Sequence, residues 1–170
     1  MTFAQTGAAA AIRPAAPGDA GLVLAFVREL ADYESLSHEV LASEADLDAA
    51  LFGPAPQVFV AIAEVGGEPA GFALWFHTFS SFTGRRGAWL EDLYVRPAFR
   101  KRGLGRALIV HVARLCAQQP GGRFEWSVLD WNAPAIRFYR SLGARVMNEW
   151  LICRTEGEAL DRLAAAAGEP

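Results

Sequence analysis

Apolar side chains recur at every third or fourth position along parts of the chain, and this spacing predicts amphipathic helices. In the first such stretch Leu22, Phe26 and Leu30 share one face, and Asp19 stands before them as a possible N-cap. Ser43 followed by Asp46 is typical of the start of a shorter helix. Helices are therefore predicted over residues 19–34, 43–51, 103–119, 132–142 and 158–166.

Shorter apolar runs between these helices, rich in β-branched and aromatic residues, predict strands. They cover residues 12–14, 58–65, 70–79, 88–95, 123–129 and 146–153. Gly66-Gly67 separates the second and third runs and indicates a tight hairpin. Hairpin-connected strands beside strand–helix–strand units predict an α/β class protein, in which a mixed sheet carries helices on both faces.

Composition narrows the class of protein. The 170 residues carry a net charge of −3, which argues against a nucleic-acid partner, and no apolar run approaches the roughly 20 residues of a membrane span. We expect one domain over residues 11–163 with flexible tails at 1–10 and 164–170. Cys116 and Cys153 are too few for a disulfide framework, which favours the cytoplasm, and the three scattered histidines predict no metal site.

A basic, glycine-bearing loop between a predicted strand and a predicted helix is the strongest chemical signal. Arg100 to Arg106 place backbone N–H groups at the start of the helix, where anions are favoured. Glycines at 103 and 105 permit close approach of a phosphate to the backbone. The alternative interpretation is an ordinary basic surface turn.

This loop resembles the Arg/Gln-x-x-Gly-x-Gly/Ala motif of the GCN5-related N-acetyltransferases (GNAT family). The resemblance covers about residues 11–163 and is closest to the diamine acetyltransferase branch. Further segments that look like this branch are Glu29–Glu34, Leu90–Val95, Val128–Asn132, Phe138-Tyr139 and Leu142–Ala144. It implies the fold of that family, a mostly antiparallel mixed sheet flanked by helices. It also implies acetyl-coenzyme A (acetyl-CoA) as cosubstrate and a homodimer, for whose interface the apolar Trp150-Leu151-Ile152 is a candidate.

The resemblance also assigns residues to the cosubstrate. Loop amides would bind its diphosphate, and the backbone of one strand would pair with the pantetheine arm. Asn132, an ordinary N-cap by its residue type, would contact the same arm. The resulting cofactor-binding set is Leu93, Tyr94, Val95, Arg100, Lys101, Arg102, Gly103, Leu104, Gly105, Arg106, Asn132 and Ala135.

Transfer of an acetyl group to an amine needs a base, because a lysine-like amine has a pKa of about 10.4 and is mostly protonated near neutral pH. Glu91 is the candidate base, acting through water or directly, since apolar neighbours could raise its pKa. Asp92 is a weaker candidate on the opposite strand face. Tyr139 matches the tyrosine that protonates the departing thiolate. The alternative for Glu91 is a structural role as the charge partner of a neighbouring arginine. The alternative for Tyr139 is a core or interface aromatic side chain.

Tyr33, Glu34 and Glu91 match positions that approach the amine in diamine acetyltransferases. Glu29 and Asp32 add acidic charge nearby, unless they form a merely solvated face. Polyamine-specific relatives carry an acidic residue in the loop that here reads Phe79 to Gly84 with serines, so the chain looks closer to the thialysine-acetylating branch. The expected acceptor is therefore a small cationic molecule with a primary amine: a diamine, a polyamine or a thialysine-like or lysine-like amino acid.

Two alternatives stay open at this stage. One is a coenzyme A-binding sensor or interaction module without turnover. The other is a GNAT enzyme that acetylates a protein lysine or an antibiotic amine.

Overall fold

The computed structural model describes residues 9–118 and 122–166. They fall into two units, Met1–Leu129 and Asp130–Pro170, and each unit is described by itself. Most of both expected tails lies outside the described residues. The described part of the first tail already contains the start of a strand at Ala10.

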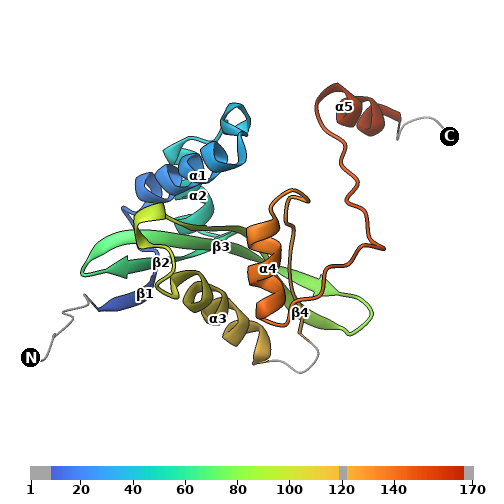
Figure 1. Ribbon diagram of the computed structural model, residues 1–170. Coiled ribbons are helices and arrows are strands. Elements are labelled where there is room, and N and C mark those ends of the chain that lie inside the picture. The colour runs from blue at the N-terminus through green and yellow to red at the C-terminus, as the bar shows by residue number, and fades with distance from the viewer. Residues whose placement is uncertain (1–8, 119–121, 167–170) are drawn as a thin grey trace, which may run out of the picture. The chain divides into compact units, whose positions relative to one another are not determined.

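The first unit is built on a five-stranded sheet whose strands lie in chain order (Figure 1). Its neighbouring strands are antiparallel, except for the last pair, which is parallel. The mixed, mostly antiparallel sheet predicted above is therefore confirmed. The strands are β1 (Ala10–Pro14), β2 (Phe59–Val65), β3 (Glu68–Ser80), β4 (Arg85–Val95) and β5 (Phe124–Trp126).

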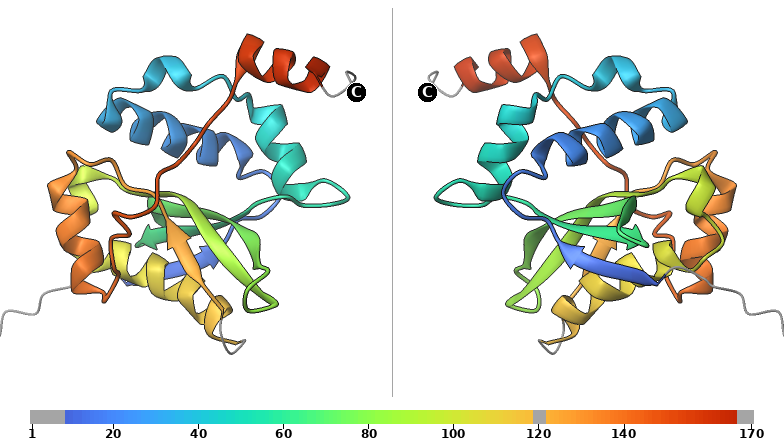
Figure 2. Two further views of the ribbon diagram at one scale, coloured as in Figure 1. Left: turned by 90° about the vertical axis from the view of Figure 1, so that its right-hand side faces the viewer. Right: turned by 90° about the vertical axis from the view of Figure 1, so that its left-hand side faces the viewer.

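Helices cover both faces of this sheet. Helices α1 (Ala20–Glu34) and α2 (Glu44–Phe52) lie on one face, and α3 (Leu104–Ala117) lies on the other (Figures 1 and 2). The rings of Phe26 on α1 and Phe72 on β3 stack with their centroids 5.2 Å apart, in the core between α1 and the sheet. The predicted capping start of α2 is present, because the side chain and backbone of Ser43 exchange hydrogen bonds with Asp46.

A β-bulge interrupts the pairing of β3 with β4. Leu74 pairs with Asp92, whereas the next residue of β3, Trp75, pairs with Leu90. Glu91 is therefore an extra residue on β4, and simple alternation of side chains fails there. This bulge governs the geometry of the site described below.

The second unit contains helices α4 (Ala133–Ser141) and α5 (Gly157–Ala165). The strand predicted over 146–153 is not formed, and the side chains of Trp150, Leu151 and Ile152 are exposed. The described residues of this unit hold no other strand with which the segment could pair, and a lone strand leaves its backbone groups without partners. The strand predicted over 123–129 is likewise reduced to the three residues of β5.

Candidate active site

The loop between β4 and α3 ends in a cradle of backbone amides. Gly103 is the N-cap of α3 with a φ of 80°, and Lys101 also has a positive φ of 62°. The first helical hydrogen bond runs from Ala107 N to Gly103 O, so the amides of residues 104–106 precede it. Among the described residues no side chain caps this helix start, and apart from the residues next to Gly103 in the chain none of their atoms lies within 4 Å of the point where a Cβ on Gly103 would stand. These amides are therefore accessible to an anion, and binding of the diphosphate there stays a prediction.

The cationic side chains of the loop divide into two groups. Lys101, Arg102 and Arg106 are exposed around the start of α3 and bring positive charge to it, and an Arg102 nitrogen also donates to the carbonyl of Ala98 over 3.4 Å. Arg96 turns away and binds Glu29 of α1, with its Nη2 atom 2.7 Å from a carboxylate oxygen. Arg100 also turns away, since its Nε donates to the carbonyl of Val95 over 2.8 Å. The side chains of Arg96 and Arg100 thus serve contacts with α1 and with the end of β4.

One backbone edge of β4 is open beside this loop. Strand β3 pairs with β4 from Arg85 to Val95, whereas β5 pairs only with Ala88–Leu90. Among the described residues, no strand follows β4 on the β5 side past Leu90. The backbone of Leu93, Tyr94 and Val95 is therefore positioned as the predicted partner of an extended amide-bearing arm. Among these side chains, that of Tyr94 is buried in the core.

Carboxylates gather on the α1 side of β4. Paired residues share a face of the sheet, so Trp89 opposite Phe76 and Asp92 opposite Leu74 lie on the same side. The indole nitrogen of Trp89 donates to the Glu91 carboxylate over 2.9 Å, which places that carboxylate on this side too. The bulge therefore puts Glu91 and Asp92 on one face, and the prediction of opposite faces is wrong.

The buried member of this group is Asp92 rather than Glu91. Burial, together with the charges of Glu91 and Glu34, raises the pKa of Asp92 to about 7. Burial also raises the pKa of Glu34, at the end of α1. Glu91 is exposed, so the expected apolar surroundings are found at its neighbour instead. Glu34, Glu91 and Asp92 together form what we call the carboxylate cluster.

Other acidic residues near the end of α1 are engaged elsewhere. Glu29 is held by two nitrogens of Arg96, and Asp32 accepts a hydrogen bond from the Ser37 hydroxyl. Glu29 also acts on β4, where its charge raises the pKa of the Tyr94 hydroxyl, whereas Glu34 acts on the Asp92 carboxyl. Tyr33 is partly exposed, and the guanidinium of Arg100 lies 5.2 Å from its ring centroid.

The remaining predicted site residues belong to α4 in the second unit. Asn132 caps this helix, since its Oδ1 accepts a hydrogen bond from Ala135 N over 3.2 Å, and this confirms its predicted capping role. Tyr139 lies two turns into α4, with its ring 5.4 Å from that of Phe138. That Tyr139, Asn132 and Ala135 meet the β4 residues at one centre stays a prediction.

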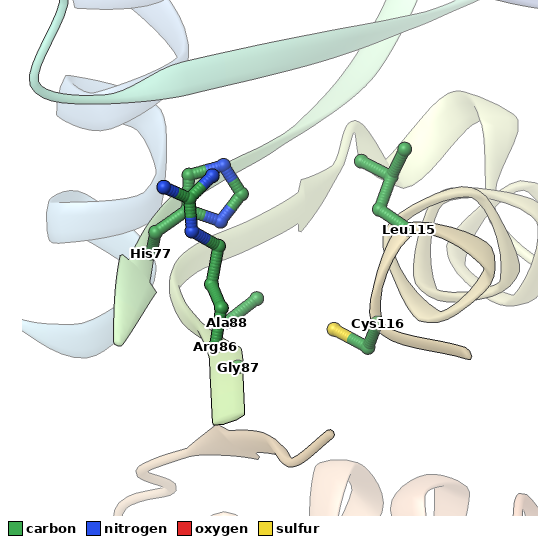
Figure 3. Close-up of a pocket in the computed structure, with 6 residues that line it drawn as sticks. All are labelled: His77, Arg86, Gly87, Ala88, Leu115 and Cys116. Atoms are coloured by element: carbon green, nitrogen blue, oxygen red, sulfur yellow. The ribbon is translucent and has the colours of Figure 1, made fainter. Parts of the chain in front are cut away.

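A separate small pocket lies between the β3–β4 hairpin and α3 (Figure 3). His77 and Arg86 line it from the strands, and Leu115 and Cys116 face them from the helix. Burial raises the pKa of the Cys116 thiol, which favours the unreactive protonated form. This pocket contains none of the predicted site residues.

The described part of the chain contains neither a metal-binding group of side chains nor a membrane-spanning helix. No group of three or more His, Cys, Asp or Glu side chains could hold a metal ion there. No helix within residues 9–118 and 122–166 is both long and apolar enough to cross a membrane.

An amide-lined loop that follows an open strand edge, with carboxylates on the same strand, fits a transferase that uses a diphosphate-bearing acyl carrier. A model of the acetyltransferase (GNAT) family matches residues 24–144, and the chain belongs to this family. It is therefore an acetyl-CoA-dependent N-acetyltransferase, and the alternative of a binding module without turnover is not favoured.

Two enzymes and one solved structure show how similar this chain is to known proteins. A thialysine N-epsilon-acetyltransferase of Sus scrofa is 41% identical over 164 residues, which are 90% of this chain and 96% of that protein. An L-ornithine N5-acetyltransferase of Arabidopsis thaliana is 29% identical over 89% of this chain and 86% of its own. Among solved structures, an integron cassette protein from the mobile metagenome of V. cholerae matches with a TM-score of 0.76 and 26% identity, covering 93% of this chain and 99% of its own.

Proposed function

We propose that this acetyltransferase transfers the acetyl group of acetyl-CoA directly to a primary amine of a small cationic acceptor. The acceptor is a diamine, a polyamine or a thialysine-like or lysine-like amino acid. One observation carries the proposal: two carboxylates of the cluster, Glu91 and Asp92, and the open edge of β4 occupy consecutive residues that lead into the amide-lined loop. The relatives named for thialysine and ornithine acetylation support the same acceptor class.

The negative potential of the cluster suits an ammonium group. Glu34 and Asp92 are partly buried, where charges interact more strongly than in water. The last turn of α1 adds the partial negative charge of a helix C-terminus next to Glu34. Binding a cation lowers the pKa values that burial raises, so the acceptor and the ionised cluster stabilise each other.

The cosubstrate would follow β4 into the loop. The amides of Leu104, Gly105 and Arg106 would hold its diphosphate, with the exposed Lys101 and Arg102 beside them. The backbone of residues 93–95 would pair with its pantetheine arm, and Asn132 and Ala135 of α4 would complete the contact.

Catalysis would need two proton transfers. An amine with a pKa of about 10.4 has roughly one molecule in a thousand neutral near pH 7.4, which adds about 4 kcal/mol to the barrier. Glu91, which is exposed and bonded to Trp89, would take the ammonium proton through a water molecule. The neutral nitrogen then attacks the thioester carbonyl, and the carbon–sulfur bond breaks. The Tyr139 hydroxyl donates its proton to the departing thiolate and takes up, directly or through water, the proton that the nitrogen loses as the amide forms.

We also propose that the protein is cytoplasmic and homodimeric. Cys116 and Cys153 are both free, which suits a reducing compartment. The exposed segment from Trp150 to Ile152 offers apolar surface to a second copy.

Thiol release from acetyl-CoA tests the proposed function. The full chain is incubated with thialysine, lysine, ornithine, short diamines, spermidine and an aminoglycoside, and free coenzyme A is titrated. We expect turnover with the small amines and loss of turnover in Glu91→Gln. Glu158→Gln on the exposed face of α5 is the matched control and should behave as the parent does. Coenzyme A binding without thiol release for any amine would refute the proposal.

A further inference from the structure

Arg100 connects the loop to α1 instead of pointing into the amide cradle. Its guanidinium lies 5.2 Å from the ring centroid of Tyr33 on α1 and 5.7 Å from that of Tyr94 on β4. Its Nε donates to the carbonyl of Val95 at the end of β4. A single cation thus contacts the end of α1, the end of β4 and the base of the loop.

The surroundings of Arg100 hold this arrangement in place. Tyr94 is buried, and burial and the charge of Glu29 raise the pKa of its hydroxyl, so the ring stays neutral. Arg96 fastens the same part of α1 by its ion pair with Glu29 and by a hydrogen bond from Nη1 to Pro69 O over 2.9 Å. Its guanidinium also lies 4.7 Å from the ring centroid of Phe26. Two arginines that follow β4 therefore contact α1, Arg96 through Glu29 and Arg100 through Tyr33.

The contact of Arg100 with Tyr33 joins the two halves of the proposed site. Tyr33 and Glu34 end α1, and Glu34 interacts electrostatically with Asp92 of the carboxylate cluster. Lys101 and Gly103, which follow Arg100, have the left-handed backbone conformation that shapes the amide cradle. The loop backbone at residues 100–103 and the ring of Tyr33 are therefore linked through one side chain, that of Arg100.

We propose that Arg100 is a positioning residue that couples the two binding events: filling the amide cradle fixes the end of α1 and thereby tightens binding of the amine. This inference rests on the proposed function, because it assumes that the cradle holds coenzyme A and that the end of α1 holds the acceptor. It revises the expectation that the Arg100 side chain serves the cosubstrate alone.

The conservative substitution Arg100→Lys separates this role from a phosphate contact. Lysine keeps the positive charge but lacks the planar guanidinium that stacks on rings and the Nε–H group that Val95 accepts. A residue that binds phosphate through its charge would be replaced by lysine with little loss. A residue that positions Tyr33 by stacking would not, so Arg100→Lys should resemble Arg100→Ala.

The coupling is measured as a ratio of dissociation constants. Calorimetry gives the Kd of coenzyme A alone and in saturating concentrations of the panel amine with the highest kcat/KM. Neither complex can react, because no acetyl group is present. In the parent we expect the amine to tighten coenzyme A binding by about five- to tenfold. In Arg100→Lys this ratio should fall to within about twofold of one, while the Kd of coenzyme A alone changes less than about twofold.

Two further variants complete the test. Arg102→Ala, in the exposed group beside the cradle, should weaken coenzyme A binding and keep the coupling ratio of the parent. Tyr33→Leu should lower the ratio by itself, and Arg100→Lys should add nothing further in that background, since both remove the same contact. Thermal melting of each variant establishes that it is folded.

Three results would overturn the inference. The first is a parent coupling ratio of one. The second is an Arg100→Lys variant that keeps the parent ratio. The third is an Arg100→Ala variant whose only change is weaker binding of coenzyme A alone. These outcomes are distinct from failure of the proposed function, which would appear as a parent protein that releases no thiol with any amine.

Discussion

The raised pKa of the partly buried Asp92 predicts how the free energy of unfolding depends on pH. Burial, with the charges of Glu91 and Glu34, raises its pKa from 3.8 to about 7 in the folded chain. Between these two values the folded state holds a proton that the unfolded state has released. The free energy of unfolding therefore falls as the pH rises through this window, and the loss is complete above the folded pKa.

Asp92→Asn removes this loss, because an amide stays neutral at every pH. A pKa difference of about three units corresponds to a ceiling of about 4 kcal/mol. Asp92 is only partly buried, and local relaxation and water reduce the ceiling, so we expect about 2 kcal/mol. The variant should match the parent near pH 4 and exceed its stability by this amount near pH 8.

Urea unfolding followed by tryptophan fluorescence, at pH values from about 4 to about 8, measures the difference. Asp48→Asn, which removes an exposed carboxylate from α2, is the matched control. Titrating groups that do not interact with Asp92 contribute equally to the parent and to the variant and cancel in the difference, whereas Glu91 and Glu34 are coupled to Asp92 and form part of the measured effect. If the stability difference between Asp92→Asn and the parent stays constant within about 0.5 kcal/mol over this range, Asp92 ionises as it does in the unfolded chain and the reasoning is wrong.

Three further predictions concern the cosubstrate, the acid and the assembly. Gly103→Val should raise the Kd of coenzyme A at least about tenfold, whereas Gly84→Val, at another positive φ in the β3–β4 turn, should not; equal binding in both variants would contradict the amide cradle. Tyr139→Phe should lower kcat about tenfold or more with little change in coenzyme A affinity, and turnover within about threefold of the parent would exclude Tyr139 as the acid. Ile152→Asp should shift a dimer to a monomer in light scattering, and an unchanged mass would remove this segment from the interface.

The sequence predicts most of the fold because its elements are encoded locally. Apolar spacing and caps locate α1, α2, α3 and α4 to within a few residues, and Gly66-Gly67 marks the β2–β3 hairpin. The segment 146–153 has the composition of a strand. A strand also needs a neighbouring strand to pair with, and composition does not show whether one is present. The described residues of its own unit offer none, so this prediction is wrong.

The site is predictable where it depends on the backbone and less so where it depends on side-chain direction. The start of α3 follows from Gly103 and the basic residues around it. The orientation of Arg96 and Arg100 does not, because their partners on α1 lie some seventy positions earlier in the chain. A basic run looks the same whether its side chains face an anion or an acidic helix.

The bulge at Glu91 shows how one irregular residue organises the rest. It lies directly after Leu90, the last residue of β4 that pairs with β5. Bulges bend a strand and increase its twist, so the bulge turns β4 away from β5 at the point where the open edge begins. It also brings the Glu91 carboxylate beside Asp92 on the α1 side of the sheet. One inserted residue therefore has two effects. It opens the edge proposed for the pantetheine arm, and it places the carboxylates of Glu91 and Asp92 next to that edge. Deleting Glu91 should remove both the open edge and the paired carboxylates. Glu91→Gln, in contrast, keeps the bulge and removes only the charge.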